Sequence, residues 1–431
     1  MSLLRLRVLY AAQGVALGLL MPFLVPLLDG RGLRPAELGL VLGVTGVISL
    51  AAYPIWGALA DGPLGRPRAI ALSGVIAAVG GLGILLAGSD PVALAVALSV
   101  VLLGGLPWGP LSDALALETL ADDPSAYGRL RAWASLGWAV AAIAAGLTWE
   151  LVGPDLASWA FALSALGLAA LVLVPGRPRR AAAPRPAVPT TGAGATVEAA
   201  LTVEAVPIVT AVPTVEAVPI VTPGLELTAA TPGRPVGWRS ALASPILLGF
   251  LLGLFVAAIG EHATWRYVGL RILDQGGGVL LVGLAAALPA LVEIPVFASS
   301  RGMAGRLGLR MIFVLGVTVS AGLTLLIAVA PEPWMVTSLR ALDGASYALR
   351  YTGMVLIIAA LLPGRLHAVG QSLGWLIAGG VAPIVSDVVG GVVYDVLGGT
   401  ALFVFAGLLS MLGGAIAYAV LSAPAFRRPG R

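Results

Sequence analysis

The sequence predicts an all-α membrane protein of twelve transmembrane helices, arranged as two six-helix bundles. Apolar residues make up 59% of the 431 positions and charged residues only 11%, and the apolar residues fall into twelve separate runs. A helix needs about 20 apolar residues to cross a hydrocarbon core roughly 30 Å thick. Each run is long enough, and none shows the polar and apolar alternation of a barrel strand, so helices are expected.

Six apolar runs precede residue 176, and six follow a proline-rich middle segment. The first six cover about 7–28, 38–60, 68–88, 91–119, 128–149 and 156–174. The second six cover about 243–268, 277–299, 307–330, 333–361, 367–389 and 399–421. Arg5 and Arg7 precede the first run, but prolines follow it without a small-residue cleavage site. We therefore expect a retained first helix and no cleaved signal peptide.

The middle segment has a different composition and repeats itself. Residues 203–210, Val-Glu-Ala-Val-Pro-Ile-Val-Thr, return unchanged at 215–222. Prolines at this frequency disrupt helices and favour extended chain. We interpret the segment as a tandem duplication in a tolerant linker, with a docking segment for a partner as the alternative. The predicted parts are a bundle over 1–175, a linker over 176–240 and a bundle over 241–431.

Prolines and glycines inside the spans predict kinks and close helix contacts. Pro54 and Pro107 lie within the second and fourth spans, and Pro289 and Pro383 within the eighth and eleventh. Proline removes a helix hydrogen bond and bends the axis. Gly39-x-x-x-Gly43 is a small-xxx-small pair, which lets two helices approach closely.

The distribution of arginine predicts the orientation in the membrane. If the N-terminus is cytoplasmic, the cytoplasmic loops carry most of the positive charge, as such loops usually do. These loop arginines are Arg66, Arg68, Arg129, Arg131, Arg177, Arg179, Arg180, Arg185, Arg301, Arg306, Arg310 and Arg365. We therefore expect a multi-pass protein of the cell inner (plasma) membrane with both termini and the linker in the cytoplasm.

The composition argues against several classes of function. The chain has no cysteine, no lysine and only two histidines, so thiol nucleophiles and thiolate metal sites are excluded. Gly276-Gly277-Gly278 lacks the lysine of a nucleotide-binding loop, and no Gly-x-Ser-x-Gly elbow is present. The arginines form no patch interleaved with aromatic residues, which argues against nucleic acid. No cofactor or metal is expected.

One loop resembles the hallmark of the major facilitator superfamily. Gly57-Ala-Leu-Ala-Asp61, followed by Gly65-Arg66-Pro67-Arg68, lies between the second and third spans. The basic residue that this family usually has directly after the aspartate is Gly62 here. The resemblance implies a charge latch that shifts as the cavity opens. Its residues would be Gly57, Asp61, Gly65, Arg66 and Arg68.

A second stretch is similar to the lactose permease-like branch, which includes sugar, phenylpropionate and nucleoside symporters. It runs from Pro110-Leu-Ser-Asp113 to Tyr127-Gly-Arg-Leu-Arg131 and on to Trp138. The resemblance implies that Asp113 and Arg131 bind substrate hydroxyls and that Trp138 stacks on a ring. It likewise implies a substrate contact for Glu293 in the eighth span.

The chain departs from that branch in the residues linked to proton coupling. Ser346 stands where the branch has its proton-carrying glutamate, and the arginine expected in the ninth span is absent. Arg340 and Asp343 stand where the branch has lysine and histidine. Coupling of the lactose type is therefore in question.

Charges inside the apolar runs are costly in lipid, so they face a partner or a cavity. Glu293 binds substrate or a proton, or else pairs with Arg340. Asp113 and Arg131 either pair or line the cavity, where Trp138 lies two turns along the same helical face as Arg131.

The remaining intramembrane charges lie in the C-terminal half. Glu261 is expected to pair with Arg340 or to line the cavity, and Arg340 and Asp343 can equally pair with each other because they are three residues apart. His262 and Arg266 are expected near the outer mouth. The predicted proton-coupling or ion-pair residues are Glu261, Arg340, Asp343 and Asp387.

These features predict a secondary transporter that moves a small organic solute, sugar-like or an aromatic acid, by alternating access. The resemblance favours proton-coupled symport, with an efflux antiporter of the same fold as the alternative. A polytopic membrane enzyme and a non-transporting receptor are less favoured. The expected partners are the solute, protons and the bilayer, and the expected state is a monomer.

Overall fold

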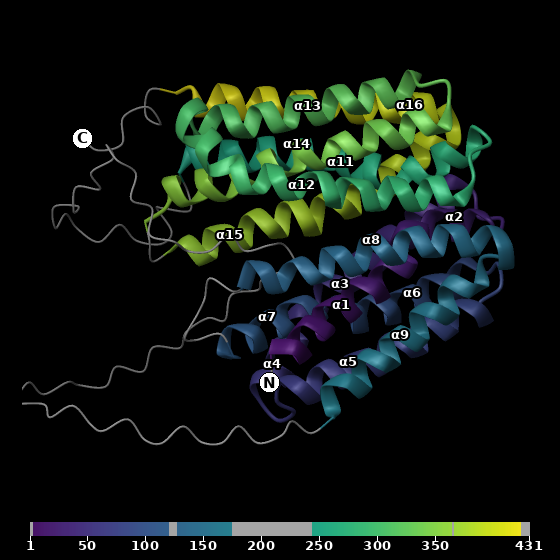
Figure 1. The fold of residues 1–431 in the computed structure, drawn as a ribbon. Helices are drawn as coiled ribbons and strands as arrows, with labels where there is room; N and C mark the ends of the chain where they lie inside the picture. The colour runs from purple at the N-terminus through teal and green to yellow at the C-terminus, as the bar shows by residue number, and fades with distance from the viewer. Residues whose placement is uncertain (1–2, 120–126, 175–243, 364–365, 424–431) are drawn as a thin grey trace, which may run out of the picture.

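The computed structural model describes residues 3–119, 127–174, 244–363 and 366–423, and every regular element in these ranges is helical (Figure 1). The N-terminal half comprises α1 (Leu3–Leu20), η1 (Met21–Phe23), α2 (Leu24–Asp29), α3 (Pro35–Leu50), α4 (Ala52–Asp61), α5 (Arg66–Leu86), α6 (Pro91–Gly105), α7 (Trp108–Thr119), α8 (Tyr127–Val152) and α9 (Asp155–Leu173). The C-terminal half comprises α11 (Pro245–Asp274), α12 (Val279–Leu307), α13 (Leu309–Val329), α14 (Pro333–Leu361), α15 (His367–Trp375), η4 (Leu376–Val381) and α16 (Ala382–Leu421). The predicted linker over 176–240 lies outside the described residues.

Twelve crossings follow from eleven long apolar segments. Among the described residues, eleven helical segments are long and apolar enough to span a bilayer, and the last, Val369–Leu421, has 53 residues. This segment turns back at Gly398, whose φ of 83° is the left-handed conformation that glycine adopts readily. Leu402 consequently lies 3.6 Å from where a Cβ on Gly390 would be, although 12 residues of straight helix would separate them by about 18 Å. The prediction of twelve spans is confirmed.

Several spans are broken where a proline removes a backbone hydrogen bond. The second span is split at Ala51, three residues before Pro54, and the fourth is split just before Trp108, at Pro107. The eleventh span contains a π-helical segment, η4, which ends two residues before Pro383. In contrast, α12 continues through Pro289 and Pro295.

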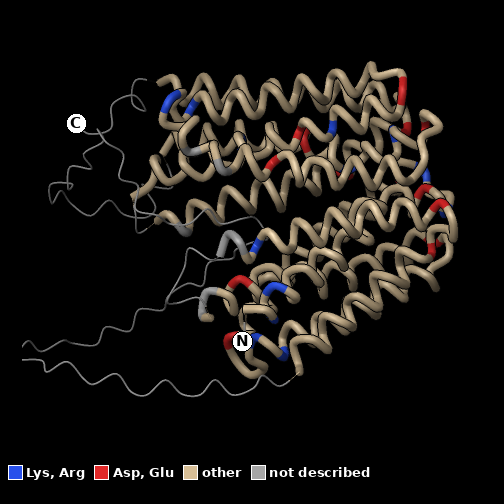
Figure 2. The backbone as a smooth tube through the Cα atoms, in the orientation of Figure 1, with Lys and Arg blue, Asp and Glu red and all other residues tan. Residues whose placement is uncertain are grey.

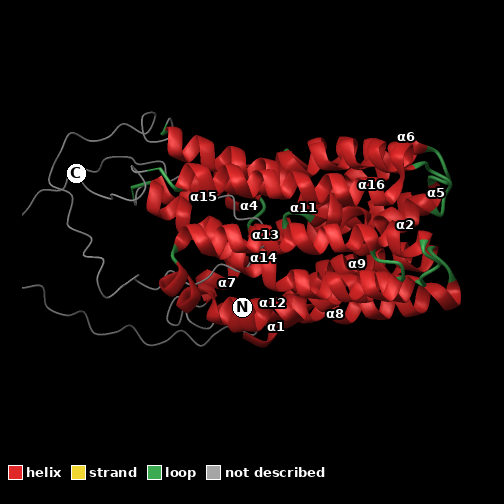
Figure 3. Ribbon diagram, turned by 90° about the horizontal axis from the view of Figure 1, so that it is seen from above, coloured by secondary structure: helices red, strands yellow, loops and turns green. Residues whose placement is uncertain are grey.

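The outer surface of the helices is apolar. Large side chains such as Leu86, Val92 and Leu163 are 88%, 70% and 65% exposed, which is a surface suited to lipid. Charged positions gather at the two ends of the molecule, with a few inside the C-terminal half (Figure 2). The helices run roughly in one direction with the loops at both ends (Figure 3). The chain is therefore a multi-pass membrane protein.

The two halves meet along two helix pairs, α8 against α12 and α3 against α16. Both pairs make close contacts near the end of the molecule opposite the N-terminus, which we call the distal end. Its connections are the turns at 30–34, 87–90, 153–154, 275–278 and 330–332, and the turn at Gly398 within α16. Toward the other end the ribbons of the two halves diverge (Figure 1).

Candidate functional site

Arg131 and Glu293 approach each other from opposite halves. Arg131 lies near the start of α8 and Glu293 in the middle of α12, and the two charges are close enough to interact electrostatically. Arg131 also lies close enough to the hydroxyl groups of Tyr347 and Tyr351 on α14 to interact with them electrostatically. Glu293 is partly exposed. Two of the four predicted substrate residues are thus brought together between the halves.

Asp113 lies deeper in the N-terminal half, on α7. It is 4% exposed and accepts a hydrogen bond of 2.5 Å from the hydroxyl of Tyr10 on α1. One residue away, Ser112 is hydrogen-bonded to Gln13, also on α1. Tyr10 and Gln13 were not predicted as part of the site, although a glutamine within an apolar run is a visible signal.

Trp138 takes part in the contact between the halves. It lies on α8, two turns from Arg131, and its indole Nε1 donates a hydrogen bond of 3.2 Å to the backbone oxygen of Ala286 on α12. In this arrangement the N–H group links α8 to α12.

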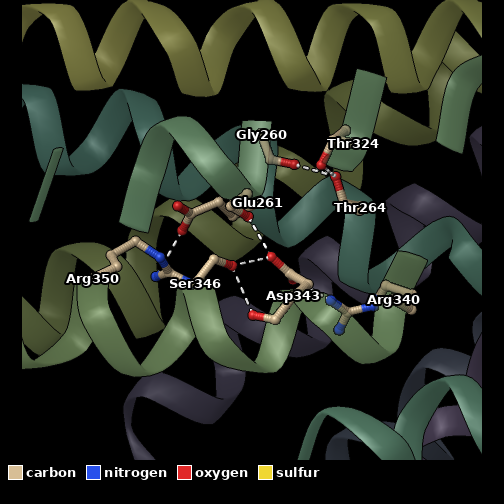
Figure 4. Close-up of polar contacts among 9 residues, drawn as sticks. Gly260, Glu261, Thr264, Thr324, Arg340, Asp343, Ser346 and Arg350 are labelled. Carbon is tan, nitrogen blue, oxygen red and sulfur yellow. Dashed lines mark hydrogen bonds and ion pairs between the residues drawn. The ribbon is translucent and has the colours of Figure 1, made fainter. Parts of the chain in front are cut away.

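A buried ion-pair network fills the core of the C-terminal half (Figure 4). Glu261 on α11 pairs with Arg350 on α14 at 2.7 Å, and both side chains are at most 15% exposed. Arg340 pairs with Asp343, three residues further along α14. Asp343 also accepts hydrogen bonds from the hydroxyls of Ser320 and Ser346.

The alternatives in which Arg340 pairs with Glu261 or with Glu293 are therefore wrong, and the alternative in which Arg340 pairs with Asp343 is correct. Glu261 pairs with Arg350, and Arg340 forms its ion pair with Asp343, which is the alternative of self-pairing on one helix face. Arg350 was not predicted as a partner, although a charge in the tenth apolar run was a sufficient signal. Glu293 likewise faces Arg131.

Asp387 belongs to a second buried cluster, at the junction of α11 and α16. Its carboxylate is only 2% exposed and accepts hydrogen bonds from Nε and Nη2 of Arg266, at 2.8 and 3.2 Å. The Nε2 atom of His262 lies 4.0 Å from Asp387 and 3.4 Å from Arg266. The backbone oxygen of Asp387 accepts a hydrogen bond from Tyr267. Arg266 is thus the ion-pair partner of Asp387, a pairing that was not predicted.

The predicted latch residues lie at the end of the molecule near the N-terminus. Asp61, the last residue of α4, pairs with Arg66 at 3.4 Å, and Arg66 also donates to the backbone oxygen of Ala114 on α7. Gly65 has a φ of 71° and precedes α5, and Arg68 is exposed. Gly57 has open space around it. The loop therefore connects α4, α5 and α7 through Arg66.

Four aromatic rings form a cluster next to Glu293 that the sequence analysis missed. Phe297, Tyr347, Tyr351 and Trp375 come from α12, α14 and α15, with ring centroids 5.6 to 6.2 Å apart in successive contacts. Arg350 lies over the ring of Tyr347 at 5.2 Å. Tyr347 and Tyr351 are four residues apart on α14, but Phe297 and Trp375 are far from them in sequence. No local sequence pattern therefore predicts the cluster.

A narrow cavity lies between the halves, on the distal side of this region. Met21, Pro22 and Val25 line it from the N-terminal half, and Trp265, Arg266 and Arg340 line it from the C-terminal half. Among the described residues, no group of three or more histidine, aspartate or glutamate side chains could hold a metal ion. The described side chains in this region make ion pairs, hydrogen bonds and ring contacts.

Comparison with known proteins agrees with this architecture. The chain is 28% identical over 403 residues to the maltose permease of Geobacillus stearothermophilus, covering 92% of this chain and 89% of that protein. It is 20% identical to the uncharacterized transporter YwbF of Bacillus subtilis (strain 168), covering 88% and 84%. Among solved structures, the nucleoside transporter NupG superposes with a TM-score of 0.74 at 13% identity, over 98% of this chain and all of that one. A POT family transporter in complex with a thioalcohol-conjugated peptide has a TM-score of 0.69, also at 13% identity, over 99% and 96%.

The family model described as the MFS_1 like family matches residues 3–405. This match covers every helix of the N-terminal half and all but the end of α16 in the C-terminal half. The chain therefore belongs to the MFS_1-like family of major facilitator superfamily transporters.

Proposed function

We propose that this protein is a secondary active transporter that moves a small organic solute, sugar-like or an aromatic acid, by alternating access of its two halves. The observation that carries the proposal is the approach of Arg131 and Glu293 from opposite halves. A solute bound by both residues would contact both halves at once. Its binding energy could then drive their relative movement.

The surroundings of this pair support a solute with a ring. Tyr347 and Tyr351 stack at 6.1 Å next to Glu293, and aromatic faces bind planar or pyranose rings through dispersion and edge contacts. The printed name of the 28% identical relative, maltose permease, also favours a sugar-like solute. We assign substrate contacts to Asp113, Arg131, Trp138 and Glu293 on this basis.

We propose proton-coupled symport because carboxylates lie inside the membrane region. Glu261, Asp343 and Asp387 are held there by arginines, and such buried carboxylates are the usual carriers of protons in transporters. The loop around Asp61 and Arg66 would act as the gating latch. The N-terminal bundle would cover 1–175 and the C-terminal bundle 241–431, joined by the linker.

The arginine distribution supports a cytoplasmic location for both termini. The distal end would then face outward, and the end near the N-terminus would face the cytoplasm of a cell whose inner (plasma) membrane holds the protein as a monomer. The close packing of the halves at the distal end supports a conformation closed to the outside.

The test is uptake into proteoliposomes of a solute panel that includes maltose, glucose, a nucleoside and 3-phenylpropionate, with and without an imposed pH gradient. We expect accumulation of at least one solute that depends on the gradient.

Glu293→Gln and Arg131→Ala should each abolish this accumulation and leave the thermal unfolding midpoint nearly unchanged. Glu332→Gln, an exposed acid before α14, is the matched control. Wild-type accumulation in both site variants would remove these residues from the solute path, and solute efflux driven by inward protons would reverse the assigned direction.

A further inference from the structure

The narrow cavity between the halves has a one-sided charge. Among the described residues that line it, only Arg266 and Arg340 are charged. The carboxylates that neutralise them, Asp387 and Asp343, do not line the cavity and lie behind the two arginines. A solute in the cavity therefore meets two guanidinium groups and no carboxylate.

Both arginines are held firmly in place. Arg266 binds the carboxylate of Asp387 through Nε and Nη2, and its Cζ lies 5.0 Å from the ring centroid of Trp265. Arg340 is 6% exposed and binds Asp343 through Nη1. Groups fixed in this way need little further ordering when they bind a ligand, which favours affinity.

Arg340 retains a donor that the protein does not use. Its Nε has no hydrogen-bond partner among the described residues, although it is buried. A buried donor without a partner costs about 1–3 kcal/mol. This Nε is inaccessible in the present conformation, so an acceptor atom from a ligand would remove that cost only once the halves have separated enough to let it approach. An anionic acceptor would remove more of it, because hydrogen bonds to ionised groups are roughly twice as strong as neutral ones.

We propose that this cavity is the binding site for a carboxylate group of the transported solute, held between Arg266 and Arg340 with its organic part toward Trp265. The proposal rests on the transport function proposed above and selects the acid among its candidate solutes. A carboxylate matches the planar donor fork of arginine. Since each arginine is already balanced by an aspartate, one added negative charge is better tolerated than the two of a phosphate monoester.

The cavity also joins both halves, which gives the site a role in transport. Met21, Pro22 and Val25 belong to η1 and α2, whereas both arginines belong to the C-terminal half. The cavity is narrow in this conformation, so a solute would reach the arginines as the halves separate.

The experiment compares binding of matched acids and alcohols by the purified full-length protein in detergent. The probes are D-glucuronate against D-glucose, and 3-phenylpropionate against 3-phenyl-1-propanol, each measured by the shift of the thermal unfolding midpoint. We expect at least one acid to raise the midpoint by several degrees at millimolar concentration, and its neutral partner to give a much smaller shift.

Charge-balanced variants test the site without leaving a buried charge alone. Arg340→Gln with Asp343→Asn, and separately Arg266→Gln with Asp387→Asn, should weaken acid binding at least tenfold. Arg340→Lys, which keeps the charge but loses the fork, should weaken it less. Arg271→Gln is the matched control, because Arg271 lies on α11, donates to the oxygen of Ala328 and does not line the cavity.

Three outcomes would overturn the proposal: no shift with either acid, an equal shift with the neutral partners, or acid binding that is unchanged in both charge-balanced variants. Failure of the transport function looks different. In that case proteoliposomes accumulate no solute, while the binding shifts still report on the cavity. Accumulation of neutral solutes without any acid binding would keep the transporter and remove the carboxylate site.

Discussion

The pair of Glu261 and Arg350 illustrates how single residues tolerate the membrane interior here. Glu261 lies on α11 and Arg350 on α14, and neither side chain is more than 15% exposed. The pair therefore cross-links two helices of the C-terminal half. Removing one partner of a buried pair leaves an uncompensated charge, which costs more than removing both.

Arg350→Gln should therefore lower the free energy of unfolding by roughly 3–5 kcal/mol. The double variant Glu261→Gln with Arg350→Gln should recover most of that loss, because no charge is left unpaired. Thermal unfolding in detergent, followed by tryptophan fluorescence, measures both. Equal destabilisation in the single and double variants would show that the charges do not stabilise each other.

At this scale the sequence predicts most of the charges inside the membrane region, Arg350 excepted, but of their partners only the pairing of Arg340 with Asp343, as one of several alternatives. The apolar flanks of Glu261, Glu293 and Asp387 were sufficient to single them out. The partner depends on the rotation of each helix about its axis and on its height relative to its neighbour, and neither follows from one sequence. Glu261 pairs with Arg350 and not with Arg340 for this reason. The substrate roles given to Asp113, Arg131, Trp138 and Glu293 stay predictions.

Helix elements pack closely wherever glycine lies at the crossing. A Cβ on Gly14 of α1 would lie 2.0 Å from the backbone oxygen of Ala134 on α8, and one on Gly137 would lie 2.4 Å from that of Ala11. The backbones of α1 and α8 are thus in direct contact. This is the usual means of helix association in membranes, where apolar side chains gain nothing by leaving lipid.

Gly14→Ala should consequently destabilise the protein by about 1–3 kcal/mol, the usual cost of overpacking. Gly167→Ala is the control, because Gly167 is also a helical glycine in a span but has no atom within 4 Å of its Cβ position. It should be neutral or slightly stabilising, since alanine favours helix. The unfolding midpoints of the two variants provide the comparison, and a similar small effect in both would contradict the close approach of α1 and α8.

The elements themselves were largely predictable. The tenth span was expected at 333–361 and is α14, Pro333–Leu361. Gly39 and Gly43 were expected in a close helix contact, and they pack against α16. The proline breaks were harder to predict. Pro54 coincides with a break, whereas α12 absorbs Pro289 and Pro295, because neighbouring helices and local adjustments decide whether a span tolerates the lost hydrogen bond.

At the scale of the whole molecule, two polar contacts connect the halves at the distal end. Arg34, just before α3, pairs with Asp395 on α16 at 2.8 Å. Glu150 on α8 accepts a hydrogen bond of 3.0 Å from the backbone N–H of Leu280, in the first turn of α12. A carboxylate is favoured there by the helix dipole and by the unpaired N–H groups. Both contacts must break if the distal end opens.

Each contact is weak alone, because Arg34 is 70% exposed and exposed pairs contribute about 0–1 kcal/mol. Removing both with Arg34→Ala and Glu150→Gln should shift the balance between the closed and open distal end by about 1–2 kcal/mol, a factor of roughly 5–30.

The chain has no cysteine, so Ala286→Cys, on the lining of the cavity, would give a single reporter. Its labelling by a membrane-impermeant thiol reagent added at the distal side should accelerate several-fold in the double variant. Asp155→Asn is the control, because its partner Arg31 belongs to the same half. If the control accelerates labelling as much as the double variant does, general loosening of the distal end, and not the loss of these two contacts, is responsible.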